Sequence, residues 1–209
     1  MSYNDLVTYE EVKSRAMESD RSIDEEQTAV VDVISSVSAS VESYLNRRLI
    51  ATSHTQEVYL EQWQEERIDD TYSAWAEQWP VTEVQTTGYE GESRKIYGDA
   101  DDVRIDYIAG FRREDQTLSD VQQEVPAATV EPEPLPRDIA DVTIRLVLYY
   151  VGETADATLG IGQKEQSIGT GNALTVRGRD PAFVAREMGR LDTYKRRIHL
   201  YAWQAQGST

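Results

Sequence analysis

Histidine, glycine-rich and serine motifs are the places where this 209-residue sequence could carry chemistry. The two histidines, His54 and His199, are isolated, whereas a metal-binding motif such as HExxH needs two histidines one helical turn apart. The glycine-rich segment 160–171 lacks the GK[ST] ending with which a P-loop reaches phosphate and magnesium. No serine lies in a GxSxG elbow. We therefore predict that the chain is not an enzyme, and we assign no catalytic, metal or cofactor residue.

Carboxylates offer one more possible site. Asp99, Asp101 and Asp102 resemble part of a calcium-binding loop, but the glycine and the distal glutamate of an EF-hand are missing. A loop of solvated carboxylates is the favoured interpretation in so acidic a chain. The sequence contains no cysteine, which excludes a disulfide framework, a thiolate metal site and a cysteine nucleophile.

Targeting signals are not evident in the sequence. The longest apolar run, residues 146–151, is far too short to cross a bilayer. The first residues, Met1 to Asp5, show neither the basic region nor the apolar stretch of a signal peptide. We therefore expect a protein that is made in the cytoplasm of its host and has no membrane partner.

The overall charge is strongly negative. Asp and Glu number 38 against 21 Lys and Arg, which gives a net charge of −17, and only four of the basic residues are lysines. An acidic, lysine-poor surface is typical of proteins from halophilic organisms, and an acidic protein of an ordinary organism is the alternative. A DNA-binding protein must neutralise phosphates with Lys and Arg, so this charge argues against direct DNA binding.

The charge is also uneven along the chain. From Arg177 onward there are seven basic and three acidic residues, so this tail carries +4 and the first 176 residues carry −21. Such asymmetry is typical of an interaction surface, because the tail of one copy could lie on the acidic body of the next. A solvated basic helix end, favoured by the helix dipole, remains the alternative. The suspected contact residues are Arg177, Arg179, Arg186, Arg190, Tyr194, Lys195, Arg196 and Arg197.

Helical periodicity dominates three stretches of the sequence. Capping boxes at Thr8–Glu11 and Ser22–Glu25 predict helices over 8–18 and 22–49. A third helix over 137–152, opened by Leu135-Pro136-Arg137-Asp138, is apolar on nearly every side and should be buried. Asp180-Pro181 predicts the start of a last helix, whose apolar stripe is formed by Val184, Met188, Leu191, Tyr194, Ile198 and Tyr201.

Between these helices the pattern alternates as strands do. Alternation near 56–61, 79–84 and 103–107 predicts a small antiparallel sheet inserted over 55–111. The polar stretch 62–78 is expected to be a long excursion anchored by Trp63, Trp75 and Trp79, and 112–134 an extended linker. The predicted fold class is α+β but predominantly α-helical: a helical bundle with an inserted sheet. Its predicted domains are a core over 1–159 and a C-terminal loop and basic helical arm over 160–209.

The order of several short motifs resembles the head–tail connector (adaptor) family of long-tailed phages and archaeal tailed viruses. That family opens with a Thr-x-x-Glu-Val helix, as in Thr8 to Val12, and its second helix ends in an aromatic residue and an Arg-Arg-type tail, as in Tyr44 to Leu49. Further motifs that match in order are Pro80-Val81, Tyr107 to Phe111, Leu135-Pro136, and Leu191 with Tyr194, Lys195 and Arg196. The excursion 62–78 and the linker are longer than this family's pattern.

This resemblance implies a structural virion protein in the viral neck. Such proteins form a ring, typically a dodecamer, beneath the portal protein, and they extend the channel through which DNA passes without specific binding. The ring docks the stopper or tail-completion protein. The competing hypothesis is a monomeric acidic binding or regulatory module from a halophile.

Overall fold

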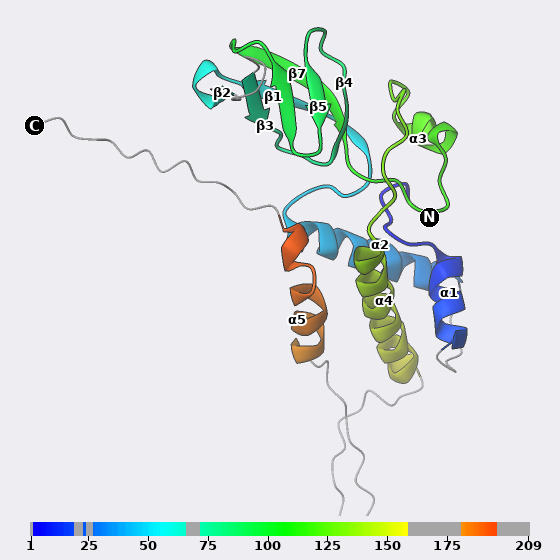
Figure 1. Ribbon diagram of the computed structural model, residues 1–209. Helices are drawn as coiled ribbons and strands as arrows, with labels where there is room; N and C mark the ends of the chain where they lie inside the picture. Colours follow the sequence, from blue (N-terminus) through cyan, green and yellow to red (C-terminus); the bar gives the residue numbers. More distant parts are fainter. Residues whose placement is uncertain (1, 19–22, 24–26, 66–71, 159–180, 196–209) are drawn as a thin grey trace, which may run out of the picture.

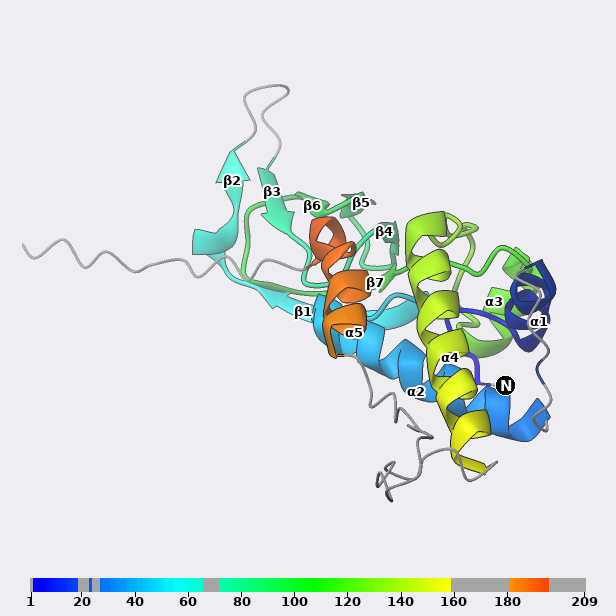
Figure 2. The ribbon, with the colours of Figure 1, turned by 90° about the horizontal axis from the view of Figure 1, so that it is seen from below.

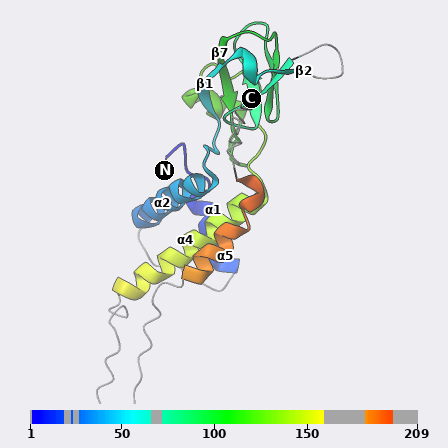
Figure 3. The same cartoon turned by 90° about the vertical axis from the view of Figure 1, so that its left-hand side faces the viewer.

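Two parts make up the molecule, a helical body and a β domain above it (Figure 1). The structure, a computed structural model, describes residues 2–18, 23, 27–65, 72–158 and 181–195. The body contains helices α1 (Tyr9–Glu18), α2 (Gln27–Leu45), α4 (Arg137–Thr158) and α5 (Pro181–Gly189). Figure 3 shows the β domain at one end of these helices.

The first helix begins at the predicted capping box. The Glu11 backbone N–H donates to Thr8 Oγ1 at 3.1 Å, and the Thr8 N–H donates to Glu11 Oε2 at 2.6 Å. These two bonds satisfy N–H groups that the first helical turn leaves free, so this prediction is confirmed. The second predicted box, Ser22–Glu25, lies outside the described residues.

Helix α2 is shorter than the predicted helix over 22–49. It ends at Leu45 because Asn46 adopts a left-handed conformation, with φ of 54°, which stops the helix. Glu42 is buried, and its Oε1 accepts the Leu49 backbone N–H at 2.8 Å. This bond turns the chain out of the helix and towards the β domain.

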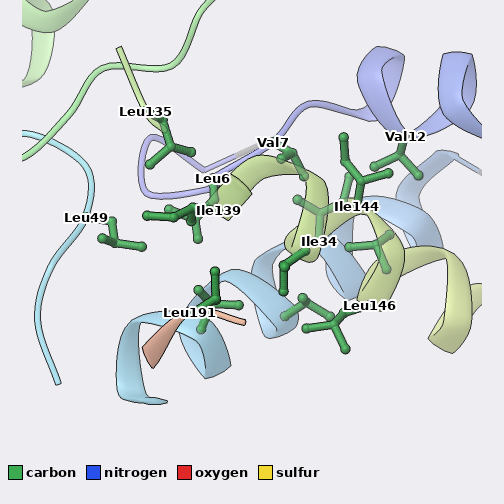
Figure 4. Close-up of a cluster of buried hydrophobic side chains, with 14 of the residues drawn as sticks. Leu6, Val7, Val12, Ile34, Leu49, Leu135, Ile139, Ile144, Leu146 and Leu191 are labelled. Carbon is green, nitrogen blue, oxygen red and sulfur yellow. The ribbon is translucent and has the colours of Figure 1, made fainter. Parts of the chain in front are cut away.

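Helix α4 lies in the middle of the body, between α1 and α5, as both Figure 1 and Figure 2 show. Its apolar side chains, including Ile139 and Leu146, are buried as predicted, and the helix continues to Thr158. Residues from all four helices meet in one hydrophobic core, among them Val12, Ile34 and Met188, and Leu191, which follows α5, joins them (Figure 4). Burial of this apolar surface is what holds the helices together.

Seven short strands, all antiparallel, form the β domain within the described residues. One sheet has the order β1-β7-β4, from Thr52–Val58, Val103–Ala109 and Val81–Val84. The other has the order β2-β3-β6-β5, from Gln64–Glu65, Tyr72–Trp75, Lys95–Gly98 and Glu90–Glu92. Side chains of both sheets, such as Ile96 and Ile105, share a second hydrophobic core, so this domain has an interior of its own.

The two parts are joined where two segments run side by side. The Ala51 N–H donates to Phe111 O at 2.8 Å, and the Phe111 N–H donates to Leu49 O at 2.6 Å. Gly110 makes this approach possible, because its φ is +122° and a Cβ at this position would lie 2.7 Å from Ala51 N. The motif Tyr107 to Phe111, one of those that match the connector family in order, is thus the place where the chain returns to the body.

The structure corrects the predicted fold class. The described residues form a mixed α+β fold with five helices and two sheets, rather than a helix-dominated bundle with one small sheet. The excursion 62–78 is partly strand: β2 and β3 lie within it, Ser73 and Ala74 are both buried, and Ala74 belongs to the core of the β domain. Strands of two and four residues with small buried side chains give almost no alternation of apolar and polar residues, so the sequence does not predict them.

The expected linker 112–134 is not extended throughout. It contains helix α3 (Leu118–Glu124), whose Val121 packs with Ile108 and Ala51 in a third, small apolar cluster. Pro132 is also buried. This segment therefore packs on the β domain and does not simply span the two parts.

Candidate interaction surface

The C-terminal helix α5 packs on the body of its own chain. Met188 and Leu191 are buried in the core of the body, and Phe183 stacks on Tyr149 of α4, with 4.7 Å between the ring centroids. Of the apolar stripe predicted here, Val184, Met188, Leu191 and Tyr194 pack on the core of the body, whereas Ile198 and Tyr201 lie outside the described residues. The helix itself ends at Gly189, and a 3-10 turn follows at Asp192–Tyr194.

Three arginines surround one buried carboxylate on the outer side of α4 and α5. The Glu187 side chain is only 4% exposed, and its Oε2 accepts Arg190 Nη1 at 2.9 Å. Arg186 Nε lies 3.5 Å from Oε1, and Arg145 Nη1 lies 4.0 Å from Oε2. The arginine side chains are 41–69% exposed. We call Arg145, Arg186 and Arg190 the arginine face; with Glu187 it carries a surplus of two positive charges.

Four of the eight suspected contact residues fall within the described part of the chain. Arg186 and Arg190 belong to the arginine face, whereas Tyr194 and Lys195 lie at the 3-10 turn, next to the end of α2. The other four, Arg177, Arg179, Arg196 and Arg197, lie outside the described residues. The structure therefore divides this set into two local groups.

The 3-10 turn is held to α2 by a polar contact. The Tyr44 hydroxyl donates to Asp192 Oδ1 at 2.6 Å, and this bond raises the pKa of Tyr44 above 10.0 because Asp192 stabilises the protonated phenol. Lys195 Nζ lies 4.3 Å from the centroid of the Tyr44 ring, within range of a cation–π contact. Burial, followed by the negative charge of Asp138, raises the pKa of Tyr194.

Arg145 is a member of the arginine face that the sequence did not reveal. It lies in the helix that was read as apolar on nearly every side, and 42 positions separate it from Glu187. Only the packing of α5 against α4 brings the two side chains together. No local spacing could have indicated this pair.

Helix α1, on the other side of α4, carries charges of both signs. It exposes Glu10, Met17 and Glu18 but also Arg15, which pairs with Glu18 at 3.3 Å, and Figure 1 shows α3 above α1, beside the β domain. The segment from Glu114 to Pro136 contains six acidic residues and no basic one. The acidic surface here thus belongs to the segment around α3, beside the β domain, and not to α1.

A buried arginine lies at the junction of the two parts. Arg47 is 4% exposed, its guanidinium carbon lies 3.3 Å from the centroid of the Trp79 ring, and its Nη1 donates to Trp79 O at 2.8 Å. Its Nε and Nη2 find no hydrogen-bond partner among the residues that the structure describes. Burial, together with the charge of nearby Arg94, lowers the pKa of Arg47 to about 9. In the described part of the chain no carboxylate forms a salt bridge with Arg47, so the Trp79 indole holds this cation by stacking.

Polar groups that could suggest catalysis have structural partners instead. His54 is half-buried, bonds Thr52 at 2.9 Å, and has its pKa lowered by burial. Asp102 Oδ1 accepts the Leu60 N–H at 2.7 Å, and the Asp101 carbonyl accepts Trp63 Nε1 at 2.9 Å. Among the residues that the structure describes, no group of three or more His, Cys, Asp or Glu side chains is placed to hold a metal ion. The glycine-rich segment 160–171 lies outside them.

Comparisons with known proteins identify no family for the chain. No protein-family model matches it, and no curated protein is similar to it. In the described part of the chain, no helix is long and apolar enough to cross a membrane.

Proposed function

We propose that the chain is a structural virion protein, a head–tail connector that forms a ring beneath the portal of a tailed virus. The ring, a dodecamer by resemblance, extends the DNA channel and docks a stopper or tail-completion protein. The order of the sequence motifs, from the Thr8 helix to the Leu-Pro start of α4, supports this assignment.

The observation that carries the proposal is the uneven charge of the chain, which is +4 from Arg177 onward and −21 over the first 176 residues. A ring of identical copies needs a heterologous interface, in which one surface of each copy binds a different surface of the next. The arginine face, with its surplus of two positive charges, and the acidic remainder of the chain offer two surfaces of opposite charge. A net charge of −17 would let DNA slide through the ring, because like charges disfavour contact with phosphate.

A second function, a monomeric acidic binding module, is favoured by the β domain. Between Thr52 and Phe111 there are 14 acidic and four basic residues, and the exposed Tyr59 and Leu60 could contact a partner. Such a module would need no second copy of itself.

Native mass measurement and electron microscopy of the full chain separate these functions. The protein is studied in concentrated salt, alone and mixed with the portal protein of the same virus, because a connector can stay monomeric until it meets the portal. We expect a ring seated on the portal. A chain that stays monomeric in both conditions, and does not bind the portal, would overturn the proposal in favour of the module.

A further inference from the structure

Strand β1 is an edge strand with one unused side. In its sheet it pairs only with β7, from Thr52 opposite Ala109 to Val58 opposite Val103, and Figure 1 shows β7 between β1 and β4. The pairing runs over all seven residues of β1 without a register shift. The other side of β1 therefore presents a regular row of backbone N–H and C=O groups.

The hydrogen bonds of β7 show which of its residues point to β1. The Gln85 N–H donates to Asp106 O at 2.8 Å, and the Asp106 N–H donates to Thr86 Oγ1 at 2.8 Å, so the backbone of Asp106 points to the β4 side. Successive residues of an antiparallel strand turn their backbone groups to alternate sides. Ile105 and Tyr107 therefore point to β1.

The outward backbone groups of β1 follow from this alternation. Gln56 lies opposite Ile105 and His54 opposite Tyr107, so these two residues are bonded to β7. Ser53, Thr55 and Glu57 turn their N–H and C=O groups outward, and all three residues are exposed. In the described part of the chain no other residue bonds these six groups.

The other sheet edges within the described residues are protected against a further strand. Strand β2 has only two residues, and β5 has three, of which Glu90 and Glu92 are charged. Strand β4 follows Pro80 and has a register shift between Val81 and Glu83. Strand β1 has no proline, lysine or bulge, although natural proteins usually pair, cover or blunt such an edge.

The chain itself contains a segment that suits this edge. After Lys195 the sequence continues Arg196-Arg197-Ile198-His199-Leu200-Tyr201-Ala202-Trp203, which lies outside the described residues. Isoleucine, tyrosine and tryptophan favour strands, and residues 196–206 contain no glycine, proline or acidic residue. Segment 159–180 is also outside, but its five glycines leave no run of seven residues to cover β1.

The place where this segment begins and its charge both fit the edge. Lys195 Nζ lies 4.3 Å from the centroid of the Tyr44 ring, and β1 begins eight positions after Tyr44, so the tail leaves the body near the chain that enters β1. Residues 195–203 carry three positive charges and no negative one, whereas residues 52–111 contain 14 acidic and four basic residues. On the outer face of β1 and β7 the excess is small, because Arg104 lies opposite Glu57. Backbone pairing therefore carries the contact, and charge only favours it.

We propose that residues 197–203 of this chain add to the free edge of β1 as a further strand of its sheet. In such strand addition, main-chain hydrogen bonds provide the affinity. The inference goes beyond the proposed function and does not depend on it. A tail that binds its own β1 completes one sheet, whereas a tail that binds β1 of the next copy makes a heterologous contact that can repeat around a ring.

Engineered cysteines test the pairing in the full chain. The natural chain has no cysteine, so a Ser53→Cys, Leu200→Cys double variant carries only the two introduced thiols. The protein is treated in concentrated salt with a short bismaleimide, and the products are separated on a denaturing gel. A link within one copy gives a monomer of altered mobility, and a link between copies gives a ladder. The matched control is Glu92→Cys, Leu200→Cys, because Glu92 is also exposed and lies on β5, an edge of the other sheet.

We expect the thiols at 53 and 200 to link at least about tenfold faster than those of the control, because paired segments have a higher effective concentration than a free tail. Equal rates in the two variants would overturn the inference. Dimers that form as fast with Ser53→Cys alone would also overturn it, because two β1 edges would then pair with each other.

A proline at position 55 tests whether the backbone makes the contact. Thr55→Pro removes the central outward N–H and no bond to β7, so the domain should fold while linking falls to the control rate. Thr55→Val is the matched variant: it also loses the Thr55 hydroxyl bond to Asp106, but it keeps the N–H and should link as fast as the parent. Equal linking in the two variants would contradict strand addition.

Amide hydrogen exchange of the natural chain gives a measurement that needs no variant. If a strand is added, the outward N–H groups of Ser53, Thr55 and Glu57 should exchange at least about tenfold more slowly than unprotected amides. Exchange at the unprotected rate, both in the free chain and in rings on the portal, would overturn the inference. Rings with unprotected amides would do so while the proposed function stands.

Discussion

Replacing the buried Glu187 by glutamine should loosen helix α5 from the body. Glutamine keeps the shape of the side chain, but it leaves three guanidinium groups within 4.0 Å without a negative charge. A hydrogen bond between charged groups contributes about 1.5–3 kcal/mol, and breaking a fully buried ion pair costs about 3–5 kcal/mol. The arginines here are 41–69% exposed, so water screens part of their repulsion. We expect Glu187→Gln to lower the free energy of unfolding by about 2 kcal/mol.

Urea unfolding followed by circular dichroism measures this loss, and native-state hydrogen exchange shows where it arises. If α5 opens locally, its amide protons should exchange about 30-fold faster in Glu187→Gln, since 1.36 kcal/mol corresponds to a factor of ten. The amide protons of α4 should change less, because α4 also packs against α1 and α2.

Glu18→Gln is the matched control. Glu18 also pairs with an arginine, Arg15 at 3.3 Å, but both side chains are largely exposed, so its loss should cost less than about 0.5 kcal/mol. If the two substitutions cost the same, or if Glu187→Gln leaves exchange in α5 unchanged, Glu187 does not organise the arginine face and the reasoning above is refuted.

Three further predictions follow from buried or bonded ionisable groups. Arg47→Ala should lower the free energy of unfolding by about 3 kcal/mol, because it leaves a cavity next to Trp79. Arg47→Met keeps the side-chain volume and removes the buried charge, so its free energy of unfolding should stay within about 1 kcal/mol of wild type. Urea unfolding measures both values. Burial lowers the pKa of His54 below 6.5, so the unfolded chain binds a proton first and stability should fall as pH drops through 6.5; His54→Gln should reduce this slope. The hydrogen bond to Asp192 raises the pKa of Tyr44 above 10.0, so the unfolded chain loses this proton first as pH rises. The free energy of unfolding should therefore fall as pH rises through 10.0, and it should fall less steeply in Tyr44→Phe. If the denaturant midpoint of the His54 or the Tyr44 variant follows the same pH curve as wild type, the titration assigned to that residue is contradicted.

The sequence identified the elements whose signal is local. Thr8 and Glu11 stand three residues apart, and the capping box they form needs no other part of the chain. The long apolar pattern of α4 predicted its burial, because a helix that is apolar on nearly every side must be covered. Short elements give too few positions for a periodic pattern: α3 has seven residues and β2 only two, so the sequence predicts irregular chain at both.

Taken alone, the sequence determined the charge of this protein, the excess of cations after Arg177, and the apolar faces of its main helices, because each depends only on residue type and spacing. The tertiary structure decided which of those charges meet. Arg145 joins Arg186 and Arg190 around Glu187 only because α5 packs along α4, and Arg47 is buried only because the β domain places Trp79 against it. Contacts between residues far apart in the chain depend on how whole elements pack, and no short-range pattern encodes that packing.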